Sequence, residues 1–360
     1  MIAKTYQKYF FKSFSGLLIQ VTLVFFCLIF ILNIFEEINF FKDLDVSFYF
    51  PIFLTILSSP SILYELFPFI FLISSQYFFI RLYEKNELNI FKYSGLTNYK
   101  ILRFVSLLSF IIGIIIVLFF YTLSAKLKHI HLDIKNKYSN DNKYLAVITE
   151  NGLWIRDEHN QKINIVSADK INQNFLTDVS IIQFDTNYEF LKRIDSNIID
   201  ISKKNWLIKN PKITESNLQS KNVKDFYFFS NFDYNKINSL FSNLTSLSLW
   251  ELGRLKKDYK SLGYSTLEIE SHIQKSISYP FYLGIMSLLS GIIMLNIKRN
   301  KSFTFNIIVG ISLSVFIYYI NYFSKVLGEN EKLPMTISIW IPLLMLGLIC
   351  LIGFVRINEK

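Results

Sequence analysis

Long apolar runs divide the chain into candidate membrane spans, separated by short polar segments and one long polar segment. A helix crosses a bilayer in roughly twenty residues, and each run is close to that length. The runs lie near 14–35, 61–80, 104–124, 277–297, 303–322 and 335–355. Residues 48–59 precede Pro60 and are expected to form an interfacial or kinked lead-in to the second run. The pattern predicts an α-helical membrane protein with six transmembrane helices.

The long polar segment, 126–243, has short stretches in which apolar and polar residues alternate with the two-residue period of strands. It predicts an inserted all-β domain, a sandwich or jelly roll. The expected strands are Tyr144–Ile148, Gly152–Ile155, Lys162–Val166, Val179–Phe184, Tyr188–Ile194, Trp206–Ile208 and Phe226–Phe229. The expected turns are Asn151-Gly152, Asp185-Thr186-Asn187 and Asp195-Ser196-Asn197.

Helical signals return after the β segment. Ser248 with Glu251, and Ser265 with Glu268, have the spacing of a capping box, and Gly263 lies between them as a helix stop. Four regions follow from this pattern. They are 1–125 with spans one to three and a short cytoplasmic helix near 84–95, 126–243 with the β domain, 244–276 with connecting helices, and 277–360 with spans four to six.

Charge and composition refine this picture. The chain has 360 residues, 51% of them hydrophobic, and a formal net charge of +10. Lys and Arg flank the spans and favour one topology, with both termini and residues 81–100 in the cytoplasm and the β domain outside. The placement of Lys and Arg beside the spans explains the positive net charge better than nucleic-acid binding does. The first run is too long for a signal peptide and is expected to remain as a span. Cys27 and Cys350 lie in apolar runs and are read as packing residues.

Motifs for intrinsic catalysis or cofactor binding are missing. The sequence has no phosphate-binding glycine loop and no nucleophile elbow. His129, His131 and Asp133 are read as part of a polar stalk in preference to a metal site. The prediction is a non-catalytic protein without cofactor or metal, so any ATP hydrolysis must come from a partner.

Several features in the spans have two interpretations. Glu65 is a functional candidate because it is ionisable, although its depth suits a carboxylate that reaches the outer interface. Pro280, Gly284 and Gly291 indicate close helix packing or a gate. Aromatic residues at the end of span five indicate an interfacial belt or a wall that contacts lipid; they are Tyr318, Tyr319, Tyr322 and Phe323.

The polar stretch Arg81–Lys100 has the pattern of a small amphipathic helix. Leu88 and Phe91 share one face, and Ser94-Gly95 ends the pattern. We expect this helix to bind a protein outside the chain.

The order of these features resembles the LptF/LptG (YjgP/YjgQ) family of lipopolysaccharide export permeases. The string Asn86–Thr97 resembles the family's coupling-helix motif, and Glu150–Ile155 resembles the strand that opens its periplasmic domain. Three further features look more like LptG than LptF: Pro280, Gly310-Ile311-Ser312, and Lys325-Val326-Leu327-Gly328 followed by Leu333-Pro334. The resemblance covers essentially the whole chain.

The resemblance implies a permease subunit of an ABC-type exporter in the bacterial inner membrane, which extracts lipopolysaccharide and passes it to a periplasmic bridge. The implied partners are an LptF-like second permease, an LptB-like ATPase dimer and an LptC-like protein. The implied ATPase-coupling residues are Glu87, Leu88, Ile90, Phe91 and Gly95, and the implied lipid cavity includes Asn33, Glu36, Tyr318, Tyr322 and Phe323. Family members can carry several basic residues at the outer end of span one, whereas Lys42 is the only one here.

Two other functions remain open from the sequence. One is a membrane-anchored scaffold or sensor whose β domain binds a partner. The other is a permease of a different ABC exporter, such as one for lipoproteins.

Overall fold

The computed structural model describes residues 5–42, 44, 46–138, 153–159, 162–172, 174–215, 220–234, 237, 244–261, 265–295 and 303–358. The chain divides into two compact units. Unit 1 comprises Met1–Lys128 and Leu267–Lys360, and unit 2 comprises His129–Thr266. Each unit is described separately below.

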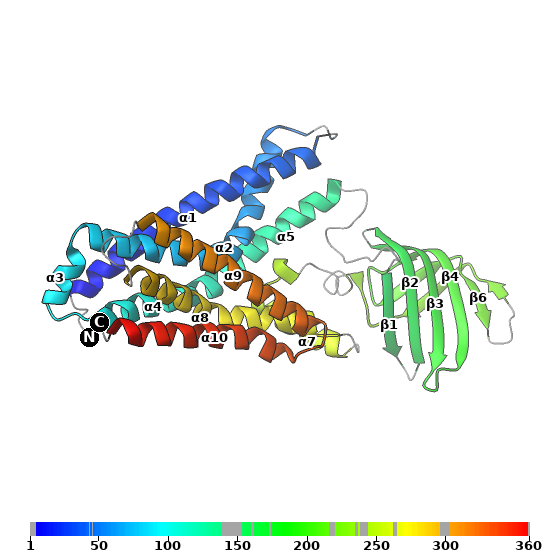
Figure 1. Cartoon of the computed structure of the whole chain (residues 1–360). Coiled ribbons are helices and arrows are strands. Elements are labelled where there is room, and N and C mark those ends of the chain that lie inside the picture. The colour runs from blue at the N-terminus through cyan, green and yellow to red at the C-terminus, as the bar shows by residue number, and fades with distance from the viewer. Residues whose placement is uncertain are drawn as a thin grey trace. The chain divides into compact units, whose positions relative to one another are not determined.

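Unit 1 is a bundle of long helices (Figure 1). Three apolar helices precede the β segment: α1 (Thr5–Phe40), α2 (Tyr49–Glu84) and α4 (Asn98–Ile115), the last of which continues through the π-helical turn η1 (Ile116–Phe120) into α5 (Tyr121–Tyr138). Three follow it: α8 (Leu267–Leu295), α9 (Phe303–Glu329) and α10 (Met335–Asn358). Six helices in the described part of the chain are long and apolar enough to cross a membrane, which confirms the predicted number of spans.

Helix α2 bears on the lead-in expected at 48–59. Residues 49–59 are the first part of a single 36-residue helix that contains Pro60 and Pro68, so they are not a separate interfacial segment. Hydroxyl groups next to Pro60 form hydrogen bonds within the helix. Ser59 Oγ donates to the Thr55 carbonyl at 2.6 Å, and Ser61 Oγ donates to the Ser58 carbonyl at 2.8 Å. Local side-chain hydrogen bonds of this kind let a transmembrane helix tolerate proline, and α2 continues through Pro60.

Helix α8 packs against α2, α4, α9 and α10. Glycines permit its close approach to α4. A Cβ atom added at Gly113 would lie 2.9 Å from Pro280 Cα, and one added at Gly291 would lie 2.2 Å from Leu102 Cδ2. Of the two interpretations of Pro280, Gly284 and Gly291, the structure supports close helix packing.

Helices α1 and α9 expose most of their apolar surface within this chain. Only about a tenth of the most apolar stretch of each helix is buried. Large apolar side chains of α1 such as Leu23, Leu28 and Phe35 are exposed, as are Phe316 and Phe323 of α9. Surfaces of this size on a membrane helix face lipid, a second subunit or a bound lipid.

Unit 2 contains an antiparallel sheet of eight described strands. They are β1 (Leu153–His159), β2 (Lys162–Asn172), β3 (Phe175–Asp185), β4 (Phe190–Asp200), β5 (Asn205–Lys209), β6 (Lys212–Glu215), β7 (Ser220–Asn222) and β8 (Asp225–Phe229). The order is β1-β2-β3-β4-β5-β8, and β6 pairs with both β4 and β7. This sheet, inserted between spans three and four, agrees with the predicted β domain. Tyr144–Ile148 and the Asn151-Gly152 turn lie outside the described residues.

The local turn signals had different outcomes. The turn at Asp185–Asn187 is confirmed, because Asp185 Oδ1 accepts hydrogen bonds from the backbone N–H groups of Asn187 and Glu189. The turn expected at Asp195–Asn197 is wrong. Ser196 lies inside β4 opposite Val179, and its hydroxyl donates to the Lys209 carbonyl at 2.9 Å. Pairing along β3 outweighs the local turn preference of Asp-Ser-Asn.

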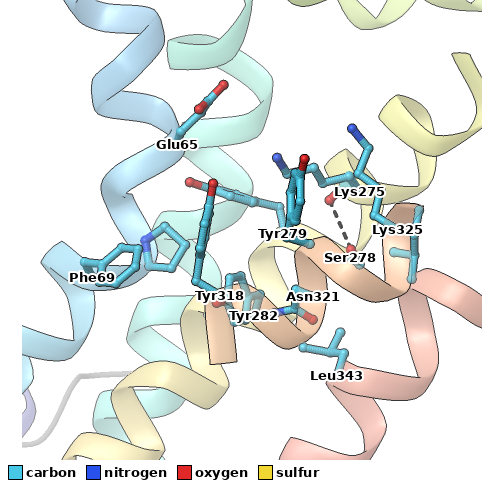
Figure 2. Close-up of a pocket in the computed structure, with 13 residues that line it drawn as sticks. Glu65, Phe69, Lys275, Ser278, Tyr279, Tyr282, Tyr318, Asn321, Lys325 and Leu343 are labelled. Atoms are coloured by element: carbon cyan, nitrogen blue, oxygen red, sulfur yellow. Dashed lines mark hydrogen bonds between the residues drawn. The ribbon is translucent and has the colours of Figure 1, made fainter. Parts of the chain in front are cut away.

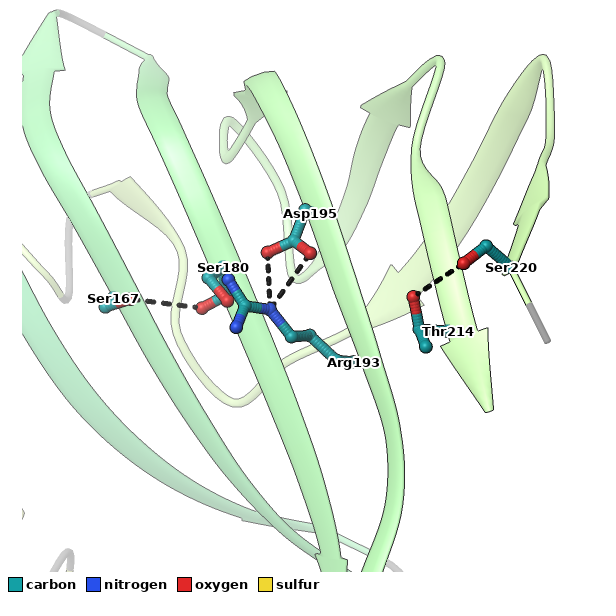
Figure 3. A network of polar contacts seen from close by, with 6 residues as sticks. All are labelled: Ser167, Ser180, Arg193, Asp195, Thr214 and Ser220. Carbon is teal, nitrogen blue, oxygen red and sulfur yellow. Dashed lines mark hydrogen bonds and ion pairs between the residues drawn. The ribbon is translucent and has the colours of Figure 1, made fainter. Parts of the chain in front are cut away.

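Polar side chains on the sheet bond mainly to one another or to neighbouring strands (Figure 3). Arg193 Nε donates to both carboxylate oxygens of Asp195 in the same strand, at 2.8 and 2.9 Å.

Two helical elements follow the last strand in the sequence, η2 (Leu244–Ser246) and α7 (Leu249–Ser261). The predicted first capping box is present, since the Ser248 N–H donates to Glu251 Oε2 at 2.7 Å.

Candidate functional site

The short helix predicted near 84–95 is present as α3 (Glu87–Tyr93), a seven-residue helix between α2 and α4. Asn86 precedes it with φ of 58°, and Asn is one of the few non-glycine residues that adopt this conformation readily. After its last turn, Leu96 N–H donates to the Phe91 carbonyl and Gly95 N–H to the Lys92 carbonyl, both at 3.0 Å. Together with φ of 82° at Gly95, these bonds form a Schellman motif. Gly95 therefore fixes where α3 ends and how the chain enters α4.

The side chains of α3 divide between an inner and an outer face. Leu88 is buried, and the Phe91 ring packs on Phe10 of α1 at a centroid distance of 5.0 Å. Ile90 is 58% exposed and Tyr93 is 91% exposed. Of the predicted apolar set, Ile90 faces outward, whereas Leu88 and Phe91 contribute to the chain's own packing. Tyr93 was missed by the sequence analysis, although its spacing of three from Ile90 marks the same helix face.

Glu87 is half-buried at the beginning of α3. Its Oε2 accepts a hydrogen bond of 2.6 Å from the hydroxyl of Tyr9 in α1. A hydrogen bond to an ionised carboxylate is short and strong, so it restricts where this carboxylate points. Tyr9 was not among the predicted site residues, because 78 positions separate the two residues and no local pattern connects them.

A cavity of about 250 Å³ lies in unit 1 between α2, α8, α9 and α10 (Figure 2). We call it the tyrosine pocket. It is lined by Glu65, Pro68, Phe69, Lys275, Ser278, Tyr279, Tyr282, Tyr318, Asn321, Tyr322, Lys325, Ile339 and Leu343.

Charges of both signs line the tyrosine pocket. Glu65 comes from α2, Lys275 from α8 and Lys325 from α9 (Figure 2). Lys325 Nζ also lies 3.2 Å from Glu329 Oε1, one helical turn further along α9. Aromatic rings beside ammonium groups form a surface suited to an anionic polar molecule, with the rings covering its less polar part.

The model of a protein family described as "Lipopolysaccharide export system permease LptF/LptG" matches residues 8–356 of the chain. The chain belongs to the LptF/LptG family. It is a multi-pass protein of the inner membrane and a permease subunit of lipopolysaccharide export, a component of a transporter. The match does not distinguish LptG from LptF, so the closer likeness to LptG stays a prediction. A comparison with curated proteins gave no match.

The residues predicted for the lipid cavity of this permease do not form one group. Tyr318 and Tyr322 line the tyrosine pocket, whereas Asn33 and Glu36 lie on α1 and are not among its lining residues. Phe323 is also on α9 and is exposed outside the pocket. Glu65, for which the sequence allowed either a functional role or a place at the outer interface, lines the pocket and is exposed. Lys275 was missed because an isolated lysine near the start of a span has no distinctive pattern.

The histidines of the permease show a local contact. His129 Nε2 lies 3.5 Å from Asp133 Oδ2, and the two residues are one turn apart on α5. In the part of the chain that the structure describes, no group of three His, Cys, Asp or Glu side chains could hold a metal ion.

Proposed function

We propose that this permease subunit is one half of an ABC-type exporter that extracts lipopolysaccharide from the inner membrane and passes it to a periplasmic bridge. An LptF-like permease pairs with it, an LptB-like ATPase dimer binds its cytoplasmic side and an LptC-like protein receives the lipid. In this arrangement both termini and α3 are cytoplasmic and the β unit is periplasmic.

The observation that carries the proposal is the outer face of α3. Ile90 and Tyr93 project from a short helix between two spans, next to the carboxylate of Glu87. Burying two such side chains against a partner contributes about 1.5–3 kcal/mol each. An exposed ion pair contributes roughly 0–1 kcal/mol. The apolar contacts would supply most of the binding free energy, and Glu87 would set the register of docking.

The tyrosine pocket supports a role in lipid handling. Lys275 and Lys325 could bind a phosphate group of the lipid, while Tyr318 and Tyr322 could cover the sugar next to it. This placement also bears on span one, where Lys42 is the only basic residue near the expected outer end. Two ammonium groups on α8 and α9 would serve in place of basic residues on α1.

Coupling of ATP to transport would operate by a shift of populations. Nucleotide binding closes the two ATPase subunits, and their closure moves α3 together with the spans to which it is attached. The collapsed state of the lipid cavity becomes favoured only to the extent that nucleotide binds this state more tightly.

Co-purification of the ATPase tests this function. Glu87→Arg reverses the charge on α3 and should remove most of the ATPase from the detergent-solubilised permease, with membrane insertion unchanged. Glu331→Arg makes the same change at the exposed loop between α9 and α10 and is the matched control. If the ATPase is retained equally by both variants, α3 is not the docking site; retention would agree with a scaffold.

Photo-crosslinking identifies the cargo. A photoreactive residue placed at Tyr322 should crosslink to lipopolysaccharide, and one placed at Leu351 on the exposed surface of α10 should give much less product. Crosslinks from Tyr322 to lipoproteins in place of lipopolysaccharide would contradict the proposed cargo.

A further inference from the structure

The cytoplasmic end of span one is attached to the coupling helix by a hydrogen bond. The Tyr9 hydroxyl of α1 donates to Glu87 Oε2 of α3 at 2.6 Å. A carboxylate has about four acceptor positions, and the described part of the chain places no donor on the other oxygen, Oε1. Glu87 can thus bind Tyr9 and a cationic group of a docked partner at the same time.

Aromatic packing surrounds this hydrogen bond. The ring of Phe91 lies 6.0 Å from that of Tyr9 and 5.0 Å from that of Phe10. Phe10 is fully buried, and its ring also contacts Phe78 of α2 and Phe104 of α4, at 5.6 and 5.9 Å. The inner face of α3 therefore meets span one directly, in a cluster that spans two and three also enter.

Helix α1 leaves most of its surface free of the other helices of this chain. Its buried side chains within the chain are few compared with its 36 residues: Phe10, Phe14, Leu18, Ile29 and Glu37. Helix α2 is by contrast buried over most of its length. Helix α1 packs chiefly against α2, so a displacement that starts at its Tyr9 end acts on that one interface more than on any other.

We propose that Tyr9 is a positioning residue that makes span one a direct output of the coupling helix. The Tyr9–Glu87 hydrogen bond joins α1 to α3 and transmits movement of α3 to α1. The inference rests on the proposed function, in which an ATPase moves α3, and it adds span one to the spans that α3 drives. The exposed face of α1 then moves with the nucleotide cycle.

The test uses Tyr9→Phe in the complete exporter, reconstituted in proteoliposomes with lipopolysaccharide as the cargo. This change removes the hydroxyl and keeps the ring that packs on Phe91. Tyr6→Phe is the matched control, because Tyr6 lies on the same helix and its ring contacts Phe10 at 5.8 Å. Tyr9→Phe should retain the ATPase and its ATP hydrolysis, while the lipopolysaccharide released per ATP falls roughly tenfold, the effect of one hydrogen bond to a charged group.

A second measurement follows the helix itself. Spin labels at Leu28→Cys on α1 and Leu348→Cys on α10, both exposed, are introduced with Cys27→Ala and Cys350→Ala. Trapping the ATP-bound state should change the distance between the labels in the otherwise unmodified exporter and in Tyr6→Phe. The change should be lost or much reduced in Tyr9→Phe.

The outcomes separate this inference from the proposed function. If Tyr9→Phe matches Tyr6→Phe in the ratio of lipid to ATP and in the distance change, the positioning role is wrong. If Tyr9→Phe releases the ATPase, Tyr9 belongs to the docking surface and the positioning role is equally wrong. If no ATPase binds the unmodified permease, the proposed function itself fails.

Discussion

At the scale of single residues, the side chains of α3 have different surroundings although they are adjacent in the sequence. Leu88 and Phe91 pack α3 against the bundle, Ile90 is exposed, and Glu87 accepts a hydrogen bond from Tyr9. The motif could be located from the sequence because its spacing is local. The direction of each side chain could not, since it depends on where α1 crosses α3.

Gly95 leads to a prediction at this scale. Its φ of 82° costs a residue with a Cβ atom about 1–2 kcal/mol. Gly95→Ala should shift the end of α3 and weaken ATPase binding by roughly tenfold. Gly95→Asn should have an intermediate effect, because Asn adopts this conformation at lower cost. Binding of the ATPase to the detergent-solubilised permease measures the order of the unmodified protein and the two variants.

Gly16→Ala is the control for that series. Gly16 lies within α1, and a Cβ atom there has nothing within 4 Å. Alanine favours a helix more than glycine does, so this variant should bind the ATPase normally. Normal binding by Gly95→Ala as well would show that the Schellman motif is not needed for docking.

At the scale of elements, the contact between α4 and α8 sets the core of the bundle. A Cβ atom at Gly113 would lie 2.9 Å from Pro280 Cα, which is backbone and cannot turn aside as a side chain can. The sequence indicated a close contact from Pro280, Gly284 and Gly291, while leaving a gate as the alternative. Which glycine faces which helix depends on the crossing of the two elements, and periodicity does not contain that information.

Gly113→Ala should therefore destabilise the bundle by about 1–3 kcal/mol, the usual cost of overpacking a well-packed core. Gly347→Ala in α10 is the matched control, because its added Cβ atom would meet Ile285 at an ordinary 3.7 Å. Thermal unfolding in detergent should show a lower midpoint for Gly113→Ala alone. Equal midpoints for the two variants would contradict the close contact at Pro280.

At the scale of the whole molecule, two units with different physical requirements share one chain. Unit 1 exposes the apolar surfaces of α1 and α9, which suit lipid or a second permease. Unit 2 has a buried apolar core around Trp206, whose indole N–H donates to the Phe232 carbonyl at 2.7 Å. The proposed topology places α3 and the β unit on opposite sides of the membrane.

Chemical labelling tests that topology. Tyr93→Cys on α3 and Tyr227→Cys on β8 both replace highly exposed side chains, in a background with Cys27→Ala and Cys350→Ala. A membrane-impermeant maleimide should label Tyr227→Cys in intact spheroplasts. It should label Tyr93→Cys only after the membrane is permeabilised. The reverse pattern, or labelling of both variants in intact spheroplasts, would refute the proposed orientation.

The sequence by itself determined the number of spans, the position of the inserted β segment and the existence of α3. These depend on runs of hydrophobicity, on two-residue alternation and on local capping, all of which act between neighbouring residues. Tertiary structure alone decided that Lys275 and Lys325 line one pocket and that Tyr9 binds Glu87. Such contacts join residues far apart in the chain, and only the packing of the helices brings them together.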